Sequence, residues 1–314
     1  MIKGKCFVVT GGAGFIGANS VIQLIKHDNE VIAIDNLSTG KMENLSEVDS
    51  QIRFVNGDIR NPELLKELFQ GVDYVLHYAA MISVPLSIKD PVSANQNNID
   101  GTLNVLMAAQ DAGVKRVVFV SSAAVYGNLP VFPKTEEMKP EPLTPYAITK
   151  LAGEYYCRIF HELYGLETVS LRYFNVFGPR QDPNSQYAAV IPKFITAMLQ
   201  GRRPVIYGDG EQSRDFTYVQ DNVDAALLAC SAGGAAGKVF NIACGRRTTL
   251  NELVEILNNI LGTDIEPVYT DPQPGDVKHS MADISLARKV LGFEPEFAFE
   301  DGLRKTVEWF KMIS

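Results

Sequence analysis

The sequence of 314 residues lacks the features that mark secreted, membrane-spanning and metal-binding proteins. Its four cysteines are scattered, with no C-x-x-C pair and no adjacent histidines, so we expect reduced, packed thiols and no metal site. No apolar run approaches the roughly eighteen residues that a membrane span requires. The first letters, MIKGKCFVVTGG, enter a strand pattern at once, which leaves no room for a signal peptide and predicts a cytoplasmic protein.

Basic residues are too few to predict a nucleic-acid partner. The formal net charge is −8 and the pI is about 5.1, and no face rich in lysine and arginine is apparent. A small anionic ligand held by a few arginines remains compatible with this balance. The apolar share of 46% and the charged share of 21% are typical of a globular protein, and we expect one large domain with one smaller one.

Short apolar, β-branched runs alternate with helix-period segments through the first half of the chain. The alternation predicts an α/β fold with a Rossmann-type doubly wound parallel sheet in residues 1–176. For residues 177–314 we expect a smaller C-terminal α/β substrate domain. Whether a late strand returns to the main sheet is left open by the sequence. The predicted strands are CFVVTGG, EVIAID, IRFVNGD, DYVLHYAA, RVVFVSS and TVSLRYFNV, with helices near 15–26, 61–70, 91–112 and 144–164.

Glycines dominate the turn after the first predicted strand. The stretch VVTGGAGFIGANS holds a G-x-G-x-x-G spacing at Gly12, Gly14 and Gly17, and Gly11 begins a second, three-residue spacing. Glycines here permit a tight turn and let the backbone approach a pyrophosphate at the positive end of the next helix. The spacing alone also fits a plain strand-to-helix turn, but its place between a strand and a helix favours a dinucleotide site.

A second predicted strand ends at Asp35, about twenty residues beyond the glycines. An acidic residue there accepts hydrogen bonds from the adenosine ribose and repels a 2′-phosphate, which favours NAD over NADP. Lys41 is the nearby cation that would favour NADP instead. Asp58, in NGDI, is placed either to contact adenine or to cap a helix.

Tyr146 and Lys150, in the stretch PYAITK, are four residues apart in a predicted helix and therefore share one face. An ammonium beside a phenol favours the phenolate, which would lower the pKa of Tyr146 from about 10 toward neutrality. Such a phenol can act as a general base. The alternative is an amphipathic helix that carries an aromatic residue and a cation at chance spacing.

Further motifs follow one another in order along nearly the whole length of the chain. The sequence resembles the extended short-chain dehydrogenase/reductase family, and within it the nucleotide-sugar 4-epimerases. The residues that carry the resemblance are TGGAGFIG, IDNLSTG, GDI, HYAA, SSAAVYG, YAITK, LRYFNVFGPRQ, SRDFTYV and PGDVKHS.

The resemblance implies a role for each of three catalytic residues. Tyr146 would take the proton from O4 of the sugar, and Ser122 would hydrogen-bond the same oxygen. Lys150 would hold the nicotinamide ribose and lower the pKa of the tyrosine. Ser121 is expected to make a cofactor or backbone contact, and Asn98 either supports the site through its amide or lies on a polar helix face.

The resemblance also implies two sets of binding residues and no metal ligand. Besides Tyr146 and Lys150, the expected NAD contacts are Gly11, Gly14, Phe15, Ile16, Gly17, Asp35, Asn36, Ser38, Gly40, Asp58, Ile59, Ala79, Ala80, Asn98 and Tyr173. Among the contacts expected for a UDP-sugar, Asn175 and Arg214 would bind the diphosphate, Tyr207 would line the uracil and Asp276 would bind the uridine ribose. The remaining substrate contacts expected are Ser83, Ser122, Gln181 and Ser280. For Arg214 the alternative is a surface salt bridge with Asp215 or Glu211.

Two alanines narrow the expected reaction. In the resembled dehydratases an acidic pair follows the catalytic hydroxyl, and the related decarboxylases carry a glutamate at the second position. Here these positions are Ala123 and Ala124. The resemblance therefore implies NAD-dependent epimerisation of a UDP-sugar at C4 through a transient 4-keto sugar.

Ser280 bears on the size of the sugar. Members limited to UDP-glucose and UDP-galactose carry a tyrosine at this position, so a serine would leave room for a 2-acetamido group, which Gln181 could hydrogen-bond. The resemblance favours UDP-GlcNAc and UDP-GalNAc, with UDP-glucose and UDP-galactose also expected. Ser280 as a mere small turn residue is the alternative. The alternative functions are a UDP-glucose or UDP-glucuronate 4-epimerase, a net oxidoreductase and a non-catalytic NAD-binding module.

Two predicted helices, 91–112 and 144–164, carry more apolar residues than one core-facing stripe needs. In the resembled family the equivalent helices form a four-helix bundle between two subunits, which implies a homodimer. Burial in the core would equally explain these residues, which are Val105, Leu106, Tyr155, Ile159 and Phe160.

Overall fold

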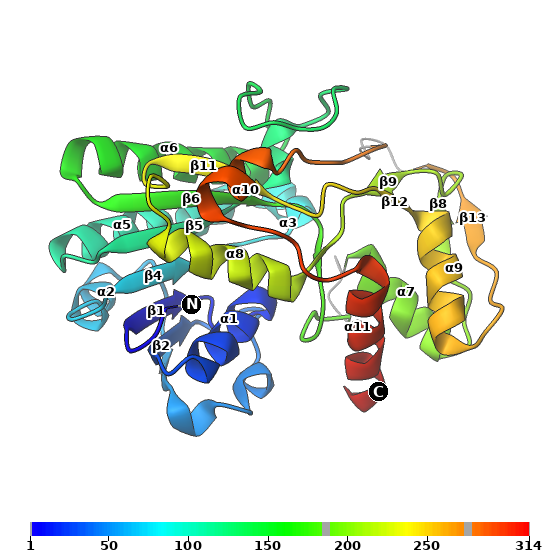
Figure 1. Cartoon of the computed structure of the whole chain (residues 1–314), viewed down its shortest axis with the longest axis horizontal. Helices are drawn as coiled ribbons and strands as arrows, with labels where there is room; N and C mark the ends of the chain where they lie inside the picture. The colour runs from blue at the N-terminus through cyan, green and yellow to red at the C-terminus, as the bar shows by residue number, and fades with distance from the viewer. Residues whose placement is uncertain (1, 184–188, 273–277, 314) are drawn as a thin grey trace.

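A seven-stranded parallel sheet forms the centre of the structure, a computed structural model that describes residues 2–183, 189–272 and 278–313 (Figure 1). Its strand order is β11-β6-β5-β4-β1-β2-β3, and every neighbouring pair is parallel. The predicted Rossmann-type sheet is thereby confirmed. The strands are β1 (Cys6–Thr10), β2 (Glu30–Asp35), β3 (Arg53–Asn56), β4 (Tyr74–His77), β5 (Arg116–Ser122), β6 (Glu167–Tyr173) and β11 (Lys238–Ile242).

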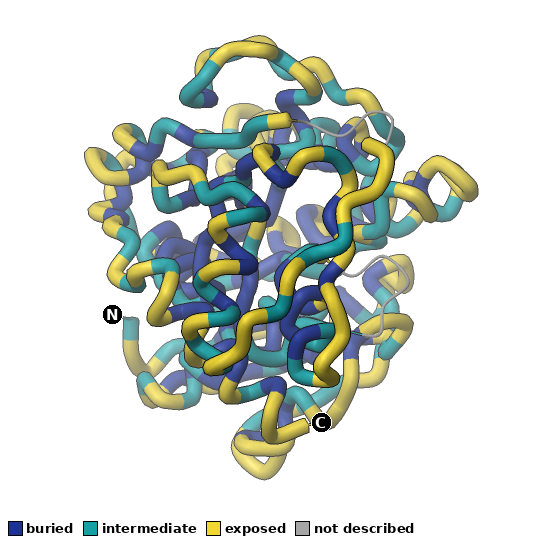
Figure 2. Tube along the Cα trace, turned by 90° about the vertical axis from the view of Figure 1, so that its right-hand side faces the viewer, coloured by how far each residue is buried: buried dark blue, intermediate teal, exposed yellow. Residues whose placement is uncertain are grey.

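Helices cover both faces of the sheet, which is why its strands read as nearly continuous apolar runs rather than as alternating ones. One hydrophobic core lies beneath α1 and α8, and a second lies beneath α2, α5 and α6. Figure 2 shows the buried stretches gathered inside an exposed outer layer. The bounds are α1 Phe15–Lys26, α2 Pro62–Leu68, α5 Gly101–Asp111, α6 Pro145–Tyr164 and α8 Val219–Ser231.

The single helix predicted over 91–112 is interrupted in the structure. It consists of α4 (Pro91–Asn95), a π-helical turn (Gln96–Asp100) and α5. Asn98 in this turn accepts a hydrogen bond from the Met81 amide (2.7 Å) and donates to Thr149 of α6 (2.9 Å). The widened turn therefore coincides with a contact to the loop after β4, a position typical of π-turns at functional sites.

The later elements form a smaller lobe beside one end of the sheet (Figure 1). It is built from α7, α9 and α11 with short strand pairs, whereas α10 packs against β11 of the main sheet. The sequence left open whether a late strand returns to the main sheet, and β11 does so, next to β6. The chain after residue 177 therefore contributes to both parts. A boundary at residue 177 stays a prediction. The helices and strands not yet given bounds, in the lobe and elsewhere, are α3 Val84–Lys89, β7 Val176–Phe177, α7 Val190–Leu199, β8 Val205–Tyr207, β9 Ser213–Arg214, β10 Thr217–Tyr218, β12 Thr248–Thr249, α9 Leu250–Leu261, β13 Val268–Thr270, α10 Ser285–Leu291 and α11 Phe299–Ile313.

The carboxyl ends of the parallel strands lie along one edge of the sheet. Ligands of doubly wound sheets bind at this edge because the loops after the strands converge there. Gly11 follows β1, Asp35 ends β2, Asp58 lies just beyond β3, Ala79 follows β4 and Ser122 ends β5. Residues predicted from separate motifs are thus brought to one edge by the fold.

Candidate active site

Tyr146 lies in the first turn of α6, and the sequence fixes where this helix begins. Thr144 is the N-cap, whose hydroxyl accepts a hydrogen bond from the Ala147 amide (3.2 Å), and Pro145 follows at the first helical position. The buried Ser87 hydroxyl accepts from the Tyr146 amide (3.1 Å). These contacts fix the backbone that carries the phenol.

Lys150 lies one turn further along α6, and its side chain is buried. Its ammonium donates to the Val120 carbonyl oxygen (2.8 Å) and lies 5.1 Å from the Phe119 ring centroid and 6.0 Å from that of Tyr146. Burial lowers the pKa of Lys150 to about 8, although nearby Cys157 and Glu154 act in the opposite direction. The predicted shared face of Tyr146 and Lys150 is confirmed.

Ser122 joins Tyr146 at the end of β5. Its hydroxyl accepts a hydrogen bond from the Ala124 amide (3.1 Å), which begins the short 3₁₀ turn Ala123–Tyr126. Burial raises the pKa of Tyr146, and the hydrogen bond with Ser122 lowers it by a smaller amount. Lys150 was expected to lower this pKa. The structure differs because the Lys150 ammonium is directed to a backbone carbonyl and burial of the phenol is the larger effect.

Behind these residues lies a buried ion pair that sequence reasoning missed. Arg172 of β6 donates to both carboxylate oxygens of Glu154, at 2.9 and 2.7 Å, and both side chains are buried. The Ser121 hydroxyl donates to the same carboxylate, so it belongs to this network rather than to the expected cofactor contact. The sequence offered one indication of this pair, because Glu154 and Arg172 are charged residues in a helix and a strand that are largely buried, and Glu154 lies four residues after Lys150.

The glycine-rich turn forms a backbone cradle of the kind that a pyrophosphate requires. Gly11 has a φ of +69°, and a Cβ there would lie 2.9 Å from the Ala79 amide nitrogen. A Cβ on Gly17 would lie 2.1 Å from the Gly11 carbonyl oxygen. No side chain caps α1 at Gly14 in the described structure, so its first-turn amides are free to bind an anion. The cradle therefore fits the diphosphate of NAD.

Asp35 is held rigidly at the end of β2. Its carboxylate accepts from the Ala13 amide (3.0 Å) and from the Leu37 amide (2.8 Å), and each oxygen keeps a lone pair for another donor. Gly40 faces this carboxylate, since a Cβ there would lie 2.7 Å from both oxygens. The arrangement fits recognition of ribose hydroxyls and supports the predicted choice of NAD over NADP.

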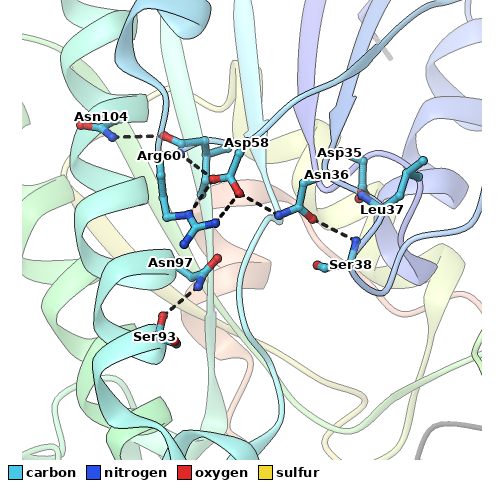
Figure 3. Close-up of polar contacts among 10 residues, drawn as sticks. Asp35, Asn36, Leu37, Ser38, Asp58, Arg60, Ser93, Asn97 and Asn104 are labelled. Atoms are coloured by element: carbon cyan, nitrogen blue, oxygen red, sulfur yellow. Dashed lines mark hydrogen bonds and ion pairs between the residues drawn. The ribbon is translucent and has the colours of Figure 1, made fainter.

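Asp58 does not cap the helix that follows it, because Asn61 is the N-cap of α2. It instead forms a forked ion pair with Arg60, at 2.9 and 2.8 Å, and accepts from the Asn36 amide at 2.9 Å (Figure 3). The hydrogen bonds from Arg60 hold the pKa of Asp58 well below its usual range. Asn36 in turn accepts from the Ser38 amide (3.1 Å), so the loops after β2 and β3 form one polar network.

Two predicted cofactor residues have side chains that are occupied inside the protein. The Asn98 amide is bonded to Met81 and Thr149, as described above, which makes it a support for the loop containing Ala79 and Ala80. The Tyr173 hydroxyl donates to the Asn222 carbonyl oxygen (2.7 Å) of α8. Phe15, Ile16 and Ile59 lie in or beside the helices α1 and α2 that border the cradle, and their contacts to NAD stay predictions.

The predicted substrate residues come from three segments of the smaller lobe and its junction. Asn175 donates to the Asp215 carbonyl oxygen (3.3 Å), and Arg214 donates to carbonyl oxygens of Ser213 (3.1 Å) and Lys278 (3.3 Å). The Ser280 amide donates to Ser213 (3.0 Å), which places Ser280 beside β9. Asp276 lies outside the described residues.

Three further predicted substrate residues lie in different settings. Tyr207, at the end of β8, is exposed. The Gln181 amide donates to the Val176 carbonyl oxygen (3.3 Å), while its own side-chain oxygen is buried with no partner among the described residues. Ser83 is the N-cap of α3, where its hydroxyl accepts from the Leu86 amide (3.2 Å). Their roles toward a sugar stay predictions.

Asp215 organises this part of the site and was weighed in the sequence only as an ion-pair partner. Its buried carboxylate accepts from the amides of Cys244 (2.9 Å), Gly245 (3.1 Å) and Ala282 (3.1 Å). Burial raises the pKa of Asp215 to about 6 despite these hydrogen bonds. The carboxylate thus ties together the segments that carry Arg214 and Ser280.

Neither a metal cluster nor a membrane span is found in the described parts of the chain. No group of three or more His, Cys, Asp or Glu side chains there could hold a metal ion. No helix among the described residues is both long and apolar enough to cross a bilayer. The described cysteines Cys6, Cys157, Cys230 and Cys244 are free thiols, as predicted.

Comparison with known proteins gives a consistent result. The model of the NAD dependent epimerase/dehydratase family matches residues 7–243. A UDP-glucose 4-epimerase of Mycolicibacterium smegmatis is 39% identical, over 97% of this chain and 98% of the relative.

Solved structures agree over the whole chain. A UDP-N-acetylglucosamine 4-epimerase of Methanobrevibacter ruminantium M1, in complex with UDP-N-acetylmuramic acid, has 49% identity and a TM-score of 0.96, with 100% of both chains covered. A UDP-glucose 4-epimerase of Thermotoga maritima with UDP-glucose has 43% identity and a TM-score of 0.93, covering 98% of this chain and 99% of the other. The resemblance predicted from the motifs is confirmed, and the chain belongs to the NAD dependent epimerase/dehydratase family.

Proposed function

We propose that the protein interconverts UDP-sugars that differ in configuration at C4, with UDP-GlcNAc and UDP-GalNAc as the favoured pair. The observation that carries the proposal is the arrangement of Ser122, Tyr146 and Lys150 at one edge of the sheet, with the Lys150 ammonium 6.0 Å from the centroid of the Tyr146 ring. Similar proteins that are named UDP-sugar 4-epimerases support the same reaction.

Bound NAD supplies the hydride acceptor and donor for this chemistry. The phenolic oxygen of Tyr146 accepts the proton of the sugar O4 hydroxyl and later returns it. Ser122 hydrogen-bonds the phenol, and it orients the O4 hydroxyl in the proposed complex. Lys150 places a positive charge near the phenol ring.

The turn after Ser122 favours epimerisation over elimination or decarboxylation. Ala123 and Ala124 form the start of the 3₁₀ turn where the resembled dehydratases and decarboxylases carry acids. A methyl group can neither donate nor accept a proton, so these positions supply no acid–base group for a second reaction. The 4-keto sugar would then be reduced again, on either face, which gives the C4 epimer.

The proposal is tested by incubating the purified protein with UDP-GlcNAc, UDP-glucose and UDP-glucuronate in separate assays. We expect C4 epimers of the first two, fastest with UDP-GlcNAc, and no accumulating absorbance at 340 nm. Stoichiometric formation of NADH would identify an oxidoreductase, and no turnover with any UDP-sugar would favour a non-catalytic NAD-binding module.

The variant Ser280→Tyr tests the proposed choice of sugar in the same assay. A bulky ring beside β9 should obstruct an acetamido group, so we expect a loss of about tenfold or more in kcat/KM for UDP-GlcNAc and a smaller loss for UDP-glucose. Equal losses for the two substrates would count against a role of Ser280 in sugar selection.

We also propose a homodimer that forms through α6 and the helices before it. Of the residues considered in the sequence, Val105, Leu106 and Phe160 are buried in the core, so for these the core explanation is correct. Tyr155 and Ile159 are exposed. On α6 they share a helical face with Ile148 and Leu163, which are also exposed, and the helices before α6 carry the exposed residues Met107, Val92 and Ile88.

Sedimentation equilibrium measures this association directly. We expect twice the monomer mass for the wild type and a monomer for Ile159→Asp, because a carboxylate would be buried without a partner at the interface. The matched control is Met312→Asp on α11, another exposed apolar residue, which should leave the dimer intact.

The free thiols of the described cysteines are typical of proteins in a reducing compartment. We therefore propose that the protein is located in the cytoplasm, which cell fractionation would check.

A further inference from the structure

Arg180 lies on the segment that leads from β7 toward the smaller lobe, in a backbone conformation rare for a residue with a side chain (φ 72°). Its guanidinium is mostly buried and contacts two other parts of the chain. Nε donates to the Asn44 carbonyl oxygen (3.1 Å), Nη1 donates to the Asn19 side-chain oxygen (3.2 Å), and Nη2 pairs with Glu47. One side chain therefore joins α1 to the segment after β2.

That segment is itself bound to the glycine-rich turn. The Lys41 amide and the Asn44 side-chain amide both donate to the Ala13 carbonyl oxygen, at 3.0 and 2.9 Å. The Ala13 amide donates to Asp35, the residue expected at the adenosine ribose. Residues 41–47 are thus a direct support of the predicted cofactor cradle, and Arg180 holds them from outside.

Two more contacts come from the same segment as Arg180. The Asn19 side-chain amide donates to the Pro179 carbonyl oxygen (3.1 Å), and Lys41 pairs with Asp182 (3.2 Å). The second pair is partly exposed and therefore weak alone. Residues 179–182 nevertheless make several separate contacts with α1 and residues 41–47, and the intervening Gln181 belongs to the predicted sugar site.

We propose that residues 179–182 form a latch that couples retention of NAD to occupancy of the UDP-sugar site, with Arg180 as its positioning residue. The left-handed backbone at Arg180 is strained and is held in place by the guanidinium contacts. When a ligand in the UDP-sugar site orders residues 179–182, less conformational free energy is needed to order residues 41–47, which support the cofactor cradle. Because such coupling is reciprocal, NAD strengthens binding of the UDP group by the same factor. The coupling rests on the proposed function, since it requires a UDP group at the smaller lobe.

The test measures the release of NADH from the complete protein by fluorescence, with and without UDP as the probe. In the wild type we expect UDP to slow release about fivefold or more. In Arg180→Ala we expect release about tenfold faster without UDP, together with loss of the UDP effect. The matched control is Arg202→Ala, an exposed arginine that pairs with Gln200 and should behave as the wild type.

Two outcomes would overturn the latch: no effect of UDP on the wild type, or an unchanged UDP effect in Arg180→Ala. The variant should fold, because Arg180 borders a cleft of about 270 Å³ between α1 and α11 that water can enter. If it does not fold, Asp182→Asn at the partly exposed Lys41 pair provides the second test, with at least a twofold reduction of the UDP effect expected and an unchanged effect contradicting the latch. Failure of the proposed epimerase activity would be seen separately, as absence of turnover, because NADH release requires none.

Discussion

Replacing Tyr146 with phenylalanine is expected to lower kcat by about 10²–10⁴-fold, because the variant keeps the ring but has no oxygen to accept the O4 proton. Binding of the UDP-sugar should change little, since the lost interaction matters chiefly in the transition state. The measurement is kcat and KM for UDP-GlcNAc at one pH, together with urea unfolding to confirm that the fold is retained.

The control on the same helix is Tyr164→Phe, which removes an exposed hydroxyl at the far end of α6. It should retain kcat within about twofold of the wild type, as expected for a surface change. Near wild-type turnover in Tyr146→Phe would end the assignment of this phenol as the base, because Ser122 is the other hydroxyl placed to act there.

The pH dependence follows from the pKa of Tyr146, which burial raises and the hydrogen bond with Ser122 lowers. A base must be deprotonated, so kcat/KM should rise about tenfold per pH unit until the pH reaches that pKa. Ser122→Ala removes the opposing hydrogen bond and should move this limb to higher pH. A limb that stays in place would show that another group titrates.

Local patterns explain why most of the fold could be predicted. The strands of the sheet are short segments with apolar, often β-branched residues, and each of the main helices has apolar residues at helical spacing. The cradle follows the same logic, because Gly11 directly follows β1 and Gly17 lies in the first turn of α1. Thr144 and Pro145 likewise predict the beginning of α6.

The missed features depend on partners distant in sequence. Glu154 and Arg172 form a buried pair between a helix and a strand, and neither residue identifies the other in the linear sequence. Arg180 contacts Asn19 and Asn44, more than a hundred residues earlier, so its role appears only in the folded chain. Asn98 interrupts a helix whose apolar spacing looks continuous, because its amide is bonded to the loop after β4.

Replacing Lys150 with methionine is expected to stabilise the cofactor-free protein by about 2 kcal/mol at pH 7 while abolishing activity. Burial lowers the pKa of Lys150 from 10.5 to about 8, and each pKa unit corresponds to about 1.4 kcal/mol. The buried ammonium therefore costs about 3 kcal/mol at neutral pH, and methionine fills a similar volume without a charge. Loss of the hydrogen bond to the Val120 carbonyl oxygen offsets about 1 kcal/mol of this gain.

The sign of the pH dependence separates this explanation from a simple packing effect. Between pH 8 and 10.5 the unfolded chain holds a proton on Lys150 that the folded chain has lost, so wild-type stability rises with pH across this window. The advantage of Lys150→Met should therefore be full below pH 8 and shrink toward pH 10.5. Urea unfolding at pH 7 and pH 10 measures both values, and Lys193→Met on the exposed side of α7 serves as the control. A variant that is less stable than the wild type at pH 7, or that is stabilised equally at both pH values, would show that the buried charge of Lys150 does not destabilise the fold. The expected result instead identifies a residue that opposes folding and is retained for chemistry.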